Sequence, residues 1–445
     1  MHPCAKSLFF AAVIAAYGAG AVFTPYSAAK PVLDSYRDRL PEQLRNPNEA
    51  KWAAWTRAED KSIRARLHQG ELDSLANFVL FGASFTKQPR IKIDALSEAN
   101  KSGLVQARID DLVSGLRNPG ENERLIFIRD LLRRDGIDPA SAEAGKFIYS
   151  TLARNLQERR TLSERAAQAK PASILDRASV FYDRGLSLDT SILPDFSIDR
   201  TLADLKQRGI LREGQVGRVA VIGPGLDFID KNDESAFDYY PPQTLQPFAV
   251  YDSLLRLGLA QPGLSLSILD ISPRVIDHIQ RARERARKNV GYEIQLPHDV
   301  SRAWSPDLSG YWSSFGEHVG GAVKPARPPG IFSGLQTRAV RVRPDVVLSC
   351  EPADVNIVLQ RLNLPASQRF DLIIATNIFV YYDPFEQALG LQNAGAMLRP
   401  GGLLLTNDKL PEIPSGVMRQ AGVTVVSFDD RDPAARDAVG WYQRK

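Results

Sequence analysis

The stretch that most constrains the fold is residues 370–408, which read FDLIIATNIFVYYDPFEQALGLQNAGAMLRPGGLLLTND. It begins with an apolar run, Leu372–Ala375, of the kind found in parallel strands buried on both faces. After a polar Thr376-Asn377 pair, Pro384 can open a helix, and apolar residues recur at helical spacing until Arg399-Pro400-Gly401-Gly402 ends it. The run Leu403–Leu405 then predicts a second buried strand. The stretch therefore predicts a β-α-β unit with polar residues at the strand edge where such sheets bind ligands.

A glycine turn at the end of a strand lies upstream. The apolar segment Arg218–Ile222 is followed by Gly223-Pro224-Gly225-Leu226-Asp227. Glycines allow a tight turn and a close approach of the backbone to a ligand. The next predicted strand, Leu266–Asp270, ends in an acid that can accept two hydrogen bonds from ribose hydroxyls. Asp270 is also well placed to cap the helix predicted from Pro273, and the pattern leaves both roles open.

These segments together resemble the class I S-adenosylmethionine-dependent methyltransferases. In that family a glycine-rich cofactor turn precedes a strand of the FDLI type, a helix, an L-x-P-G-G turn and another strand. The residues around Asn377 and Tyr381 resemble, locally, the chemotaxis-receptor glutamate methyltransferases. The similarity covers about residues 217–445 and departs from the family's pattern at Asp227, where a third glycine is usual, and at Val221, where an acid often stands. It implies a Rossmann-like domain with a mostly parallel sheet and an antiparallel last strand.

The resemblance implies S-adenosyl-L-methionine as the cofactor and assigns residues to it by position. Gly223, Gly225 and Asp227 are expected to hold the methionine part, with the Asp227 carboxylate accepting from the ammonium group. Asp270 is expected to bind the ribose.

Further residues follow from the later strands. Asp354, after a strand predicted at Val346–Ser349, matches an acid near the adenine, although capping a helix over residues 355–361 is an equal alternative. Asn377 matches a position near the methyl group, and Tyr381 or Tyr382 is expected to shape the acceptor pocket. No metal site is expected, because the histidines lack a ligand pattern.

The rest of the chain divides into an all-α domain at residues 31–193, a linker with a helix at 194–216, and the Rossmann-like domain at 217–445. Helices are expected over Trp52–Leu67 and Leu72–Phe81, followed by the ranges 104–116, 122–133, 142–169 and 198–207. This all-α domain is expected to cap the site, select a substrate or contact a partner. Two insertions, at 230–246 and 291–338, are expected to cover the cofactor or the substrate, the second as a long loop. Its His298 and His318 are candidate general bases.

The N-terminal segment, residues 1–29, contains an apolar run at residues 8–23 after Lys6 and small residues at Ser27–Ala29. This pattern is typical of a secretory signal peptide and predicts an exported or periplasmic protein. The alternative is an uncleaved anchor, with membrane association through residues 8–23 and a cytoplasmic catalytic domain, because basic residues after the run outnumber those before it.

Composition excludes several classes of protein. The net charge is +4 with basic and acidic residues interleaved, so no nucleic-acid partner is expected. Two cysteines, Cys4 and Cys350, provide no disulfide framework. Two other functions compete with methyl transfer to an unidentified acceptor. They are a nicotinamide dehydrogenase, which shares the glycine turn and Asp270, and a non-catalytic Rossmann-like domain of an exported or membrane-anchored interaction protein.

Overall fold

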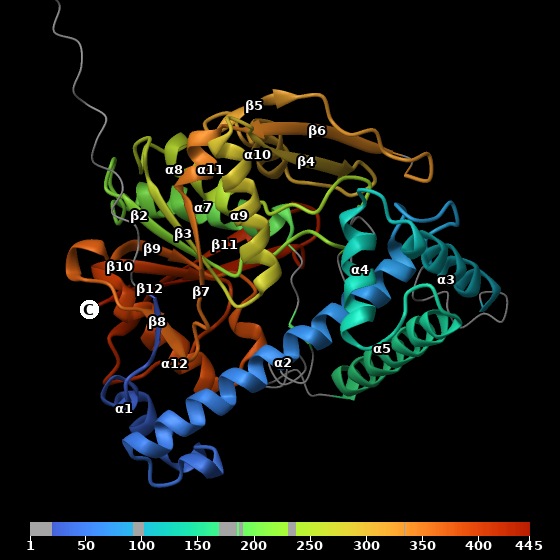
Figure 1. The fold of residues 1–445 in the computed structure, drawn as a ribbon. Coiled ribbons are helices and arrows are strands. Elements are labelled where there is room, and N and C mark those ends of the chain that lie inside the picture. The colour runs from blue at the N-terminus through green and yellow to red at the C-terminus, as the bar shows by residue number, and fades with distance from the viewer. Residues whose placement is uncertain (1–19, 92–101, 169–184, 187–189, 230–236, 333) are drawn as a thin grey trace, which may run out of the picture.

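The computed structural model describes residues 20–91, 102–168, 185–186, 190–229, 237–332 and 334–445 (Figure 1). Its helices are α1 (Tyr26–Ser35), α2 (Glu49–Phe81), α3 (Ser102–Arg117), α4 (Glu123–Arg134), α5 (Ala142–Gln168), α7 (Ile192–Gln207), α8 (Gln246–Arg256), α9 (Pro273–Arg287), α10 (Pro306–Ser314), α11 (Pro344–Ser349) and α12 (Pro384–Met397). Its strands are β1 (Ala21–Phe23), β2 (Arg218–Ile222), β3 (Ser265–Asp270), β4 (Tyr292–Asp299), β5 (Gly320–Val323), β6 (Leu335–Val342), β7 (Cys350–Asp354), β8 (Gln360–Leu362), β9 (Phe370–Ile374), β10 (Leu398–Thr406), β11 (Met418–Ser427) and β12 (Arg436–Arg444).

A seven-stranded sheet forms the centre of the Rossmann-like domain, with the order β11-β12-β10-β9-β2-β3-β7. Strand β12 pairs antiparallel with both β10 and β11, whereas the pairs β10·β9, β9·β2, β2·β3 and β3·β7 are parallel. The order reverses between β2 and β9, which makes this the topological switch point where open α/β sheets bind ligands. The predicted fold, a mostly parallel sheet with an antiparallel last strand, is confirmed.

Both faces of this sheet are buried, because successive side chains of each strand point to opposite sides. Val219 and Val221 of β2 belong to a core shared with α7, α8 and α9. Ala220 and Ile222 of the same strand belong to a second core shared with α1, α12 and the first half of α2. This two-sided burial explains why the central strands are almost entirely apolar.

Helix α2 joins the Rossmann-like domain to the group of helices α3, α4 and α5. Its N-terminal half packs in the sheet core through Trp52, Trp55 and Ile63, and its C-terminal half packs among the other helices. In Figure 1 it runs as one long diagonal between the two regions. The prediction of two helices here was wrong, because Gly70 does not break the helix. At Gly70 the backbone of Leu186 packs so closely that an added Cβ would lie 1.8 Å from the Leu186 carbonyl oxygen.

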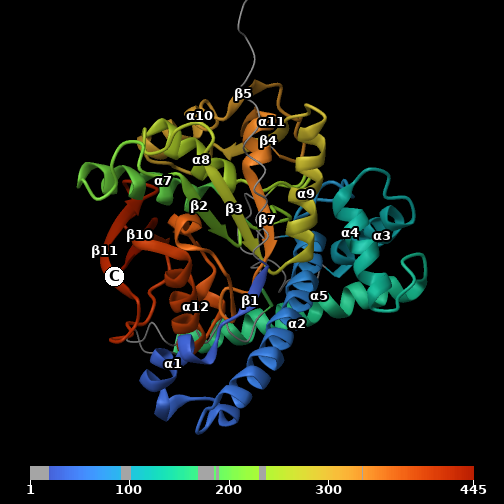
Figure 2. The same ribbon diagram turned by 60° about the vertical axis from the view of Figure 1, so that its left-hand side comes forward.

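The insertion at 291–338 was expected to be a long loop, and this expectation was wrong. It contains β4, helix α10, β5 and the start of β6. The three strands form an antiparallel sheet of order β4-β6-β5. Alternating residues in β4 and β6 supply the buried face, with Ile294, Leu296, Val340 and Val342 all in the core. Figure 2 shows this sheet at the opposite end of the molecule from α1.

The third parallel strand is also placed differently from the prediction. Residues 346–349 lie in α11, and the strand is β7, which follows it and pairs Asp354 with Asp270 at its end. Two valines in sequence favoured a strand, but Pro344 opens a helical turn there. No helix follows over residues 355–361, so Asp354 is not a helix cap.

The last residues of the N-terminal apolar run and the segment that follows it pack onto the rest of the fold. Strand β1 pairs antiparallel with β8, and the Thr24 hydroxyl donates to Asn393 Oδ1 at 2.6 Å. The small residues predicted as a cleavage site lie within α1, where Ala29 is completely buried. Within the described part of the chain, no helix combines the length and apolarity that a membrane span requires.

Candidate functional site

A cleft opens at the carboxyl ends of β2, β3 and β9, the edge where the sequence predicted cofactor binding. It encloses about 510 Å³, counting its open mouth. Its lining includes Gly223, Gly225, Asp270 and Tyr381, four of the predicted site residues. The remaining lining is mainly apolar and consists of Leu67, Leu186, Ile222, Leu269, Ile271, Val355, Ile357, Ile378 and Tyr382. Leu67 comes from α2, so this helix forms one wall of the cleft.

The glycine turn needs its glycines for conformation and for space. Gly223 and Gly225 have φ values of 61° and 68°, the left-handed region that favours glycine. A Cβ at Gly223 would also lie 2.2 Å from Ile378 Cδ1. The turn is therefore in close contact with the segment that follows β9 across the switch point.

Asp270 is the last residue of β3 and is 6% exposed. Its Oδ1 accepts from the backbone N–H of Ser272 at 2.8 Å, and the N-cap of α9 is Ser272 itself. Asp270 is therefore not the helix cap. Burial raises the pKa of Asp270 to about 7, and the neighbouring Asp354 adds to the increase.

Asp354 lies beside Asp270 but does not line the cleft. Arg64 of α2 holds its carboxylate with two hydrogen bonds, at 2.8 Å to Oδ1 and 3.2 Å to Oδ2. Arg64 also donates to Asp60 at 3.0 Å and to the carbonyl of Ile271 at 3.3 Å. The predicted adenine ligand is thus engaged by the N-terminal part of the chain.

Asn377 and the two tyrosines follow β9. Asn377 has a φ of 56° and exchanges two hydrogen bonds with Asn407, at 2.7 Å and 2.8 Å. It is exposed and does not line the cleft. Tyr381 lines the cleft, and its carbonyl accepts from Arg66 of α2 at 2.5 Å. Tyr382 is buried at 4% exposure, and burial raises the pKa of its hydroxyl.

Asp227 is not in the cleft with the glycines. It lines a second pocket on the far side of the turn, and its carbonyl accepts from Arg124 of α4 at 2.9 Å. Arg124 is 1% exposed and also donates to the carbonyls of Phe228, at 2.8 Å, and Tyr240. Arg124 therefore fixes the chain that leaves the glycine turn, and Phe228 packs into the core of the helical region.

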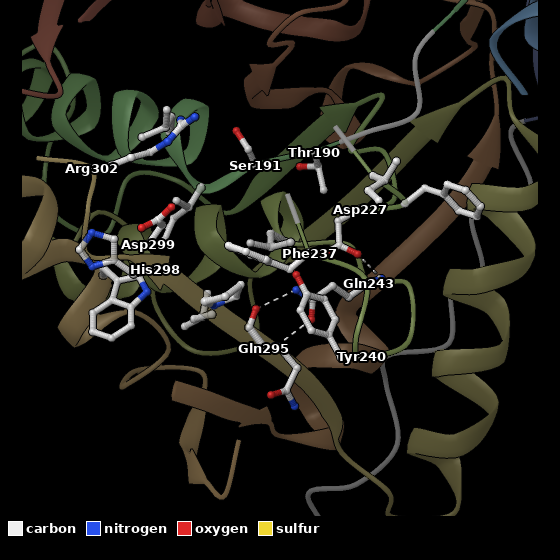
Figure 3. Close-up of a pocket in the computed structure, with 18 of the residues that line it drawn as sticks. Thr190, Ser191, Asp227, Phe237, Tyr240, Gln243, Gln295, His298, Asp299 and Arg302 are labelled. Atoms are coloured by element: carbon white, nitrogen blue, oxygen red, sulfur yellow. Dashed lines mark hydrogen bonds between the residues drawn. The ribbon is translucent and has the colours of Figure 1, made fainter. Parts of the chain in front are cut away.

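The second pocket lies between the chain after the glycine turn, the start of α7 and strand β4 (Figure 3). It encloses about 870 Å³, counting its open mouth. His298 stacks on Trp304 with ring centroids 3.5 Å apart, and burial lowers the pKa of this histidine. His318, the other candidate base, lies away from both sites with its Nδ1 3.8 Å from Asp252.

Arg64, Arg66 and Arg124 were not predicted from the sequence as site residues. They lie on helices that the sequence places far from the glycine turn, within ordinary amphipathic patterns. The described end of the insertion at 230–246, from Phe237 onward, lines the second pocket, whereas residues 230–236 lie outside the described part of the chain. Only the packing of α2 and α4 against distant parts of the chain brings Arg64 to Asp354, Arg66 to Tyr381 and Arg124 to Asp227.

Comparisons with known proteins give similarity at the level of structure. No protein-family model and no curated protein matches the chain. Among solved structures, TrmN from Thermus thermophilus is 13% identical, with 57% of this chain and 52% of TrmN covered and a TM-score of 0.26. The N-methyltransferase NodS from Bradyrhizobium japonicum WM9, bound to S-adenosyl-L-homocysteine, is 13% identical over 64% of this chain and 98% of NodS, with a TM-score of 0.26. MtNAS in complex with MTA and tNA is 11% identical over 79% of this chain and 94% of MtNAS, with a TM-score of 0.25. At these identities and TM-scores the likeness decides nothing about function.

Proposed function

We propose that this protein transfers a methyl group from S-adenosyl-L-methionine to an acceptor. The observation that carries this proposal is the joint placement of the Gly223–Gly225 turn and the buried Asp270 in one cleft at the switch point of the sheet. An acid at the end of the second strand, beside a glycine turn at the end of the first, is the arrangement by which such folds bind a nucleoside.

The residues of the cleft fit this cofactor. The carboxylate of Asp270 can accept hydrogen bonds from ribose hydroxyls, since one of its oxygens is engaged by Ser272 and the residue lines the cleft. Ile222, Val355 and Ile357 supply an apolar wall for a planar base. The turn at Gly223 and Gly225 lets the backbone approach the methionine part.

When bound, the cofactor supplies an activated methyl group on a sulfonium centre, so the protein has mainly to align an acceptor and exclude water. Leu67 of α2 and Tyr381 both line the cleft, so α2 forms one of its walls. This arrangement supports the expected capping role of the N-terminal helices.

Two observations favour methyl transfer over the alternatives. The antiparallel β12 between β10 and β11 matches the methyltransferase arrangement that the sequence resembles, whereas a dinucleotide-binding sheet keeps its sixth strand parallel. The second observation is that the buried Asp270 and the Gly223–Gly225 turn line one cleft that is open to a ligand.

The test is calorimetric titration of the full-length protein with S-adenosylmethionine, S-adenosylhomocysteine and NAD. Micromolar binding of the first two and none of NAD is expected. Asp270→Asn keeps the size of the side chain but replaces a carboxylate acceptor, and it should weaken binding by about tenfold or more.

A matched control is Asp345→Asn. Asp345 is an exposed acid in α11, with a side chain 70% exposed and an ion pair to Arg343 at 3.3 Å, and it lies outside the cleft. This variant should bind the sulfonium ligand as the unaltered protein does. If well-folded protein binds neither S-adenosylmethionine nor S-adenosylhomocysteine, the methyltransferase proposal fails and a non-catalytic domain becomes the better account.

A further inference from the structure

One outer edge of the central sheet is formed by β11, which pairs only with β12. Figure 2 shows this strand on the outer side of the molecule. The strand is ten residues long, and its register with β12 is regular from Gly422 to Ser427. Within the described part of the chain, residues 418–427 form no backbone–backbone hydrogen bond other than those of the β11–β12 pair. The outer side of a regular strand is therefore open to pairing with another strand.

The sequence of β11 lacks the features that usually protect such an edge. Natural edge strands are kept short or are interrupted by charges, proline or bulges. Strand β7, at the opposite edge of the sheet, has only five residues, and these include Glu351, Pro352 and Asp354. Strand β11 has a bulge at Ala421 near one end, and no charged residue or proline occurs over residues 420–428. The chain thus protects one edge of the sheet and leaves the other open.

Exposed valines and a groove accompany the open edge. Val425 is 60% exposed, the largest value for a large apolar side chain in the described part of the chain, and Val423 is 44% exposed. A groove of about 1220 Å³, counting its open mouth, lies between α7 and β11. All five residues from Val423 to Ser427 line this groove, although their side chains alternate between the two faces of the sheet. The groove therefore follows the edge of the strand, where an added strand would lie.

The two ends of β11 carry opposite charge. The turn at residues 429–435 contains three acids and one arginine, and its exposed Asp430 also lines the groove. The other end has the exposed Arg419 and, on β12, Arg444 opposite Met418. A second β11 that lies alongside in the antiparallel direction brings the acidic turn of each copy to the basic end of the other. A parallel neighbour would bring like charges together, which is unfavourable.

From these features we propose that β11 is a dimer interface, at which two copies of this chain pair their β11 strands antiparallel about a two-fold axis. The two central sheets then continue into one another, and the interface uses the same residues from both copies. With the axis at Thr424, Val423 of each copy lies opposite Val425 of the other, because directly opposed residues share a face of the sheet. This register also places Arg419 of each copy beside the acidic turn of the other. The dimer does not depend on the proposed methyl transfer.

The test is sedimentation equilibrium of the full-length protein from about 1 to 100 μM, the range in which a dimer of micromolar affinity dissociates. A monomer–dimer equilibrium without larger species is expected, because a two-fold interface closes on itself. Val425→Lys places a charge on the edge and should weaken dimerisation about tenfold or more. Val300→Lys is the matched control at a valine that is 57% exposed outside β11, and it should leave the equilibrium unchanged. Urea denaturation should show that both variants fold.

A charge exchange tests the antiparallel direction. Arg419→Glu alone, and Asp430→Arg alone, should each weaken dimerisation about threefold to tenfold, because two exposed pairs per dimer become repulsive. The double variant restores opposite charges across the interface and should regain most of the affinity. A protein that is monomeric at every concentration, a dimer that Val425→Lys leaves intact, or a double variant weaker than both single variants would overturn the proposal. A monomer would leave β11 open to an extended segment of another protein.

Discussion

Replacing Arg124 tests whether the helical region holds the glycine turn in place. Arg124 is 1% exposed and donates to the carbonyls of Asp227, Phe228 and Tyr240, beside the Asp227 carboxylate at 3.4 Å. Arg124→Met removes these donors and leaves a buried carboxylate without its cation. Such a loss costs about 3–5 kcal/mol, a large share of the 5–15 kcal/mol that stabilises a typical domain.

The assay is urea denaturation of the full-length protein followed by titration with S-adenosylhomocysteine. Arg124→Lys keeps the charge but loses the planar fork, so it should cost about 1–3 kcal/mol and still fold. Because the chain held by Arg124 continues from the turn that lines the cleft, ligand affinity should fall with stability. Arg133→Met, on the same helix with a side chain 58% exposed, is the control and should change the free energy of unfolding by less than about 0.5 kcal/mol. Equal effects of the two methionine variants would refute the reasoning.

Three further predictions follow from the same region. In Gly223→Ala the added Cβ would lie 2.2 Å from Ile378, and the variant should destabilise the protein by about 2–4 kcal/mol. Gly401→Ala, at a φ of 77° with nothing within 4 Å, should cost only the backbone strain of about 1–2 kcal/mol. Equal losses of stability in urea denaturation would contradict the role of the Ile378 contact. A carboxylate with a pKa of about 7 must lose its proton to accept from two hydroxyls, so S-adenosylhomocysteine affinity should level off above about pH 8, halve near pH 7 and be about tenfold lower at pH 6. Calorimetry of Asp270→Asn should show no such dependence. A chain starting at residue 30 loses Thr24 and its hydrogen bond to Asn393 and should be less stable by about 2–4 kcal/mol than one starting at residue 20; equal melting midpoints would show that residues 20–29 are dispensable.

The sequence predicted the parts of the fold that depend on local pattern. The strand at Leu372, the helix over Pro384–Met397 and the closing antiparallel strands all appear where apolar periodicity and Pro-Gly-Gly placed them. The prediction from local pattern was wrong where the same residues suit either a strand or a helix. The valines before Cys350 suit a strand as well as a short helix, and only pairing with β3 sets the strand one segment later.

The sequence predicted only those residues of the candidate site whose positions follow from the order of the strands. Gly223, Gly225, Asp270 and Tyr381 meet in one cleft because they leave the carboxyl ends of neighbouring strands, which sequence order and parallel pairing imply. Asp227 does not join them, because its side chain lines the second pocket, where Arg124 of α4 lies beside its carboxylate. The arginines from α2 and α4 depend on contacts between distant parts of the chain, for which a single sequence carries no signal.

Buried acids in this protein separate into structural and ligand-facing groups. Burial raises the pKa of Glu386 to about 8 and that of Asp195 to about 8, yet Glu386 completes the capping box of α12 and neither lines a described pocket or cleft. Asp227 and Asp270 have pKa values of about 7 and each lines a space large enough for a ligand. A raised pKa means that the folded state binds the proton more tightly than the unfolded chain, so all four acids make the ligand-free protein less stable as the pH rises toward 8. At Asp270, where the proposed cofactor donates ribose hydroxyls to the carboxylate, binding should offset this cost, and the stabilisation gained on binding is therefore expected to increase with pH.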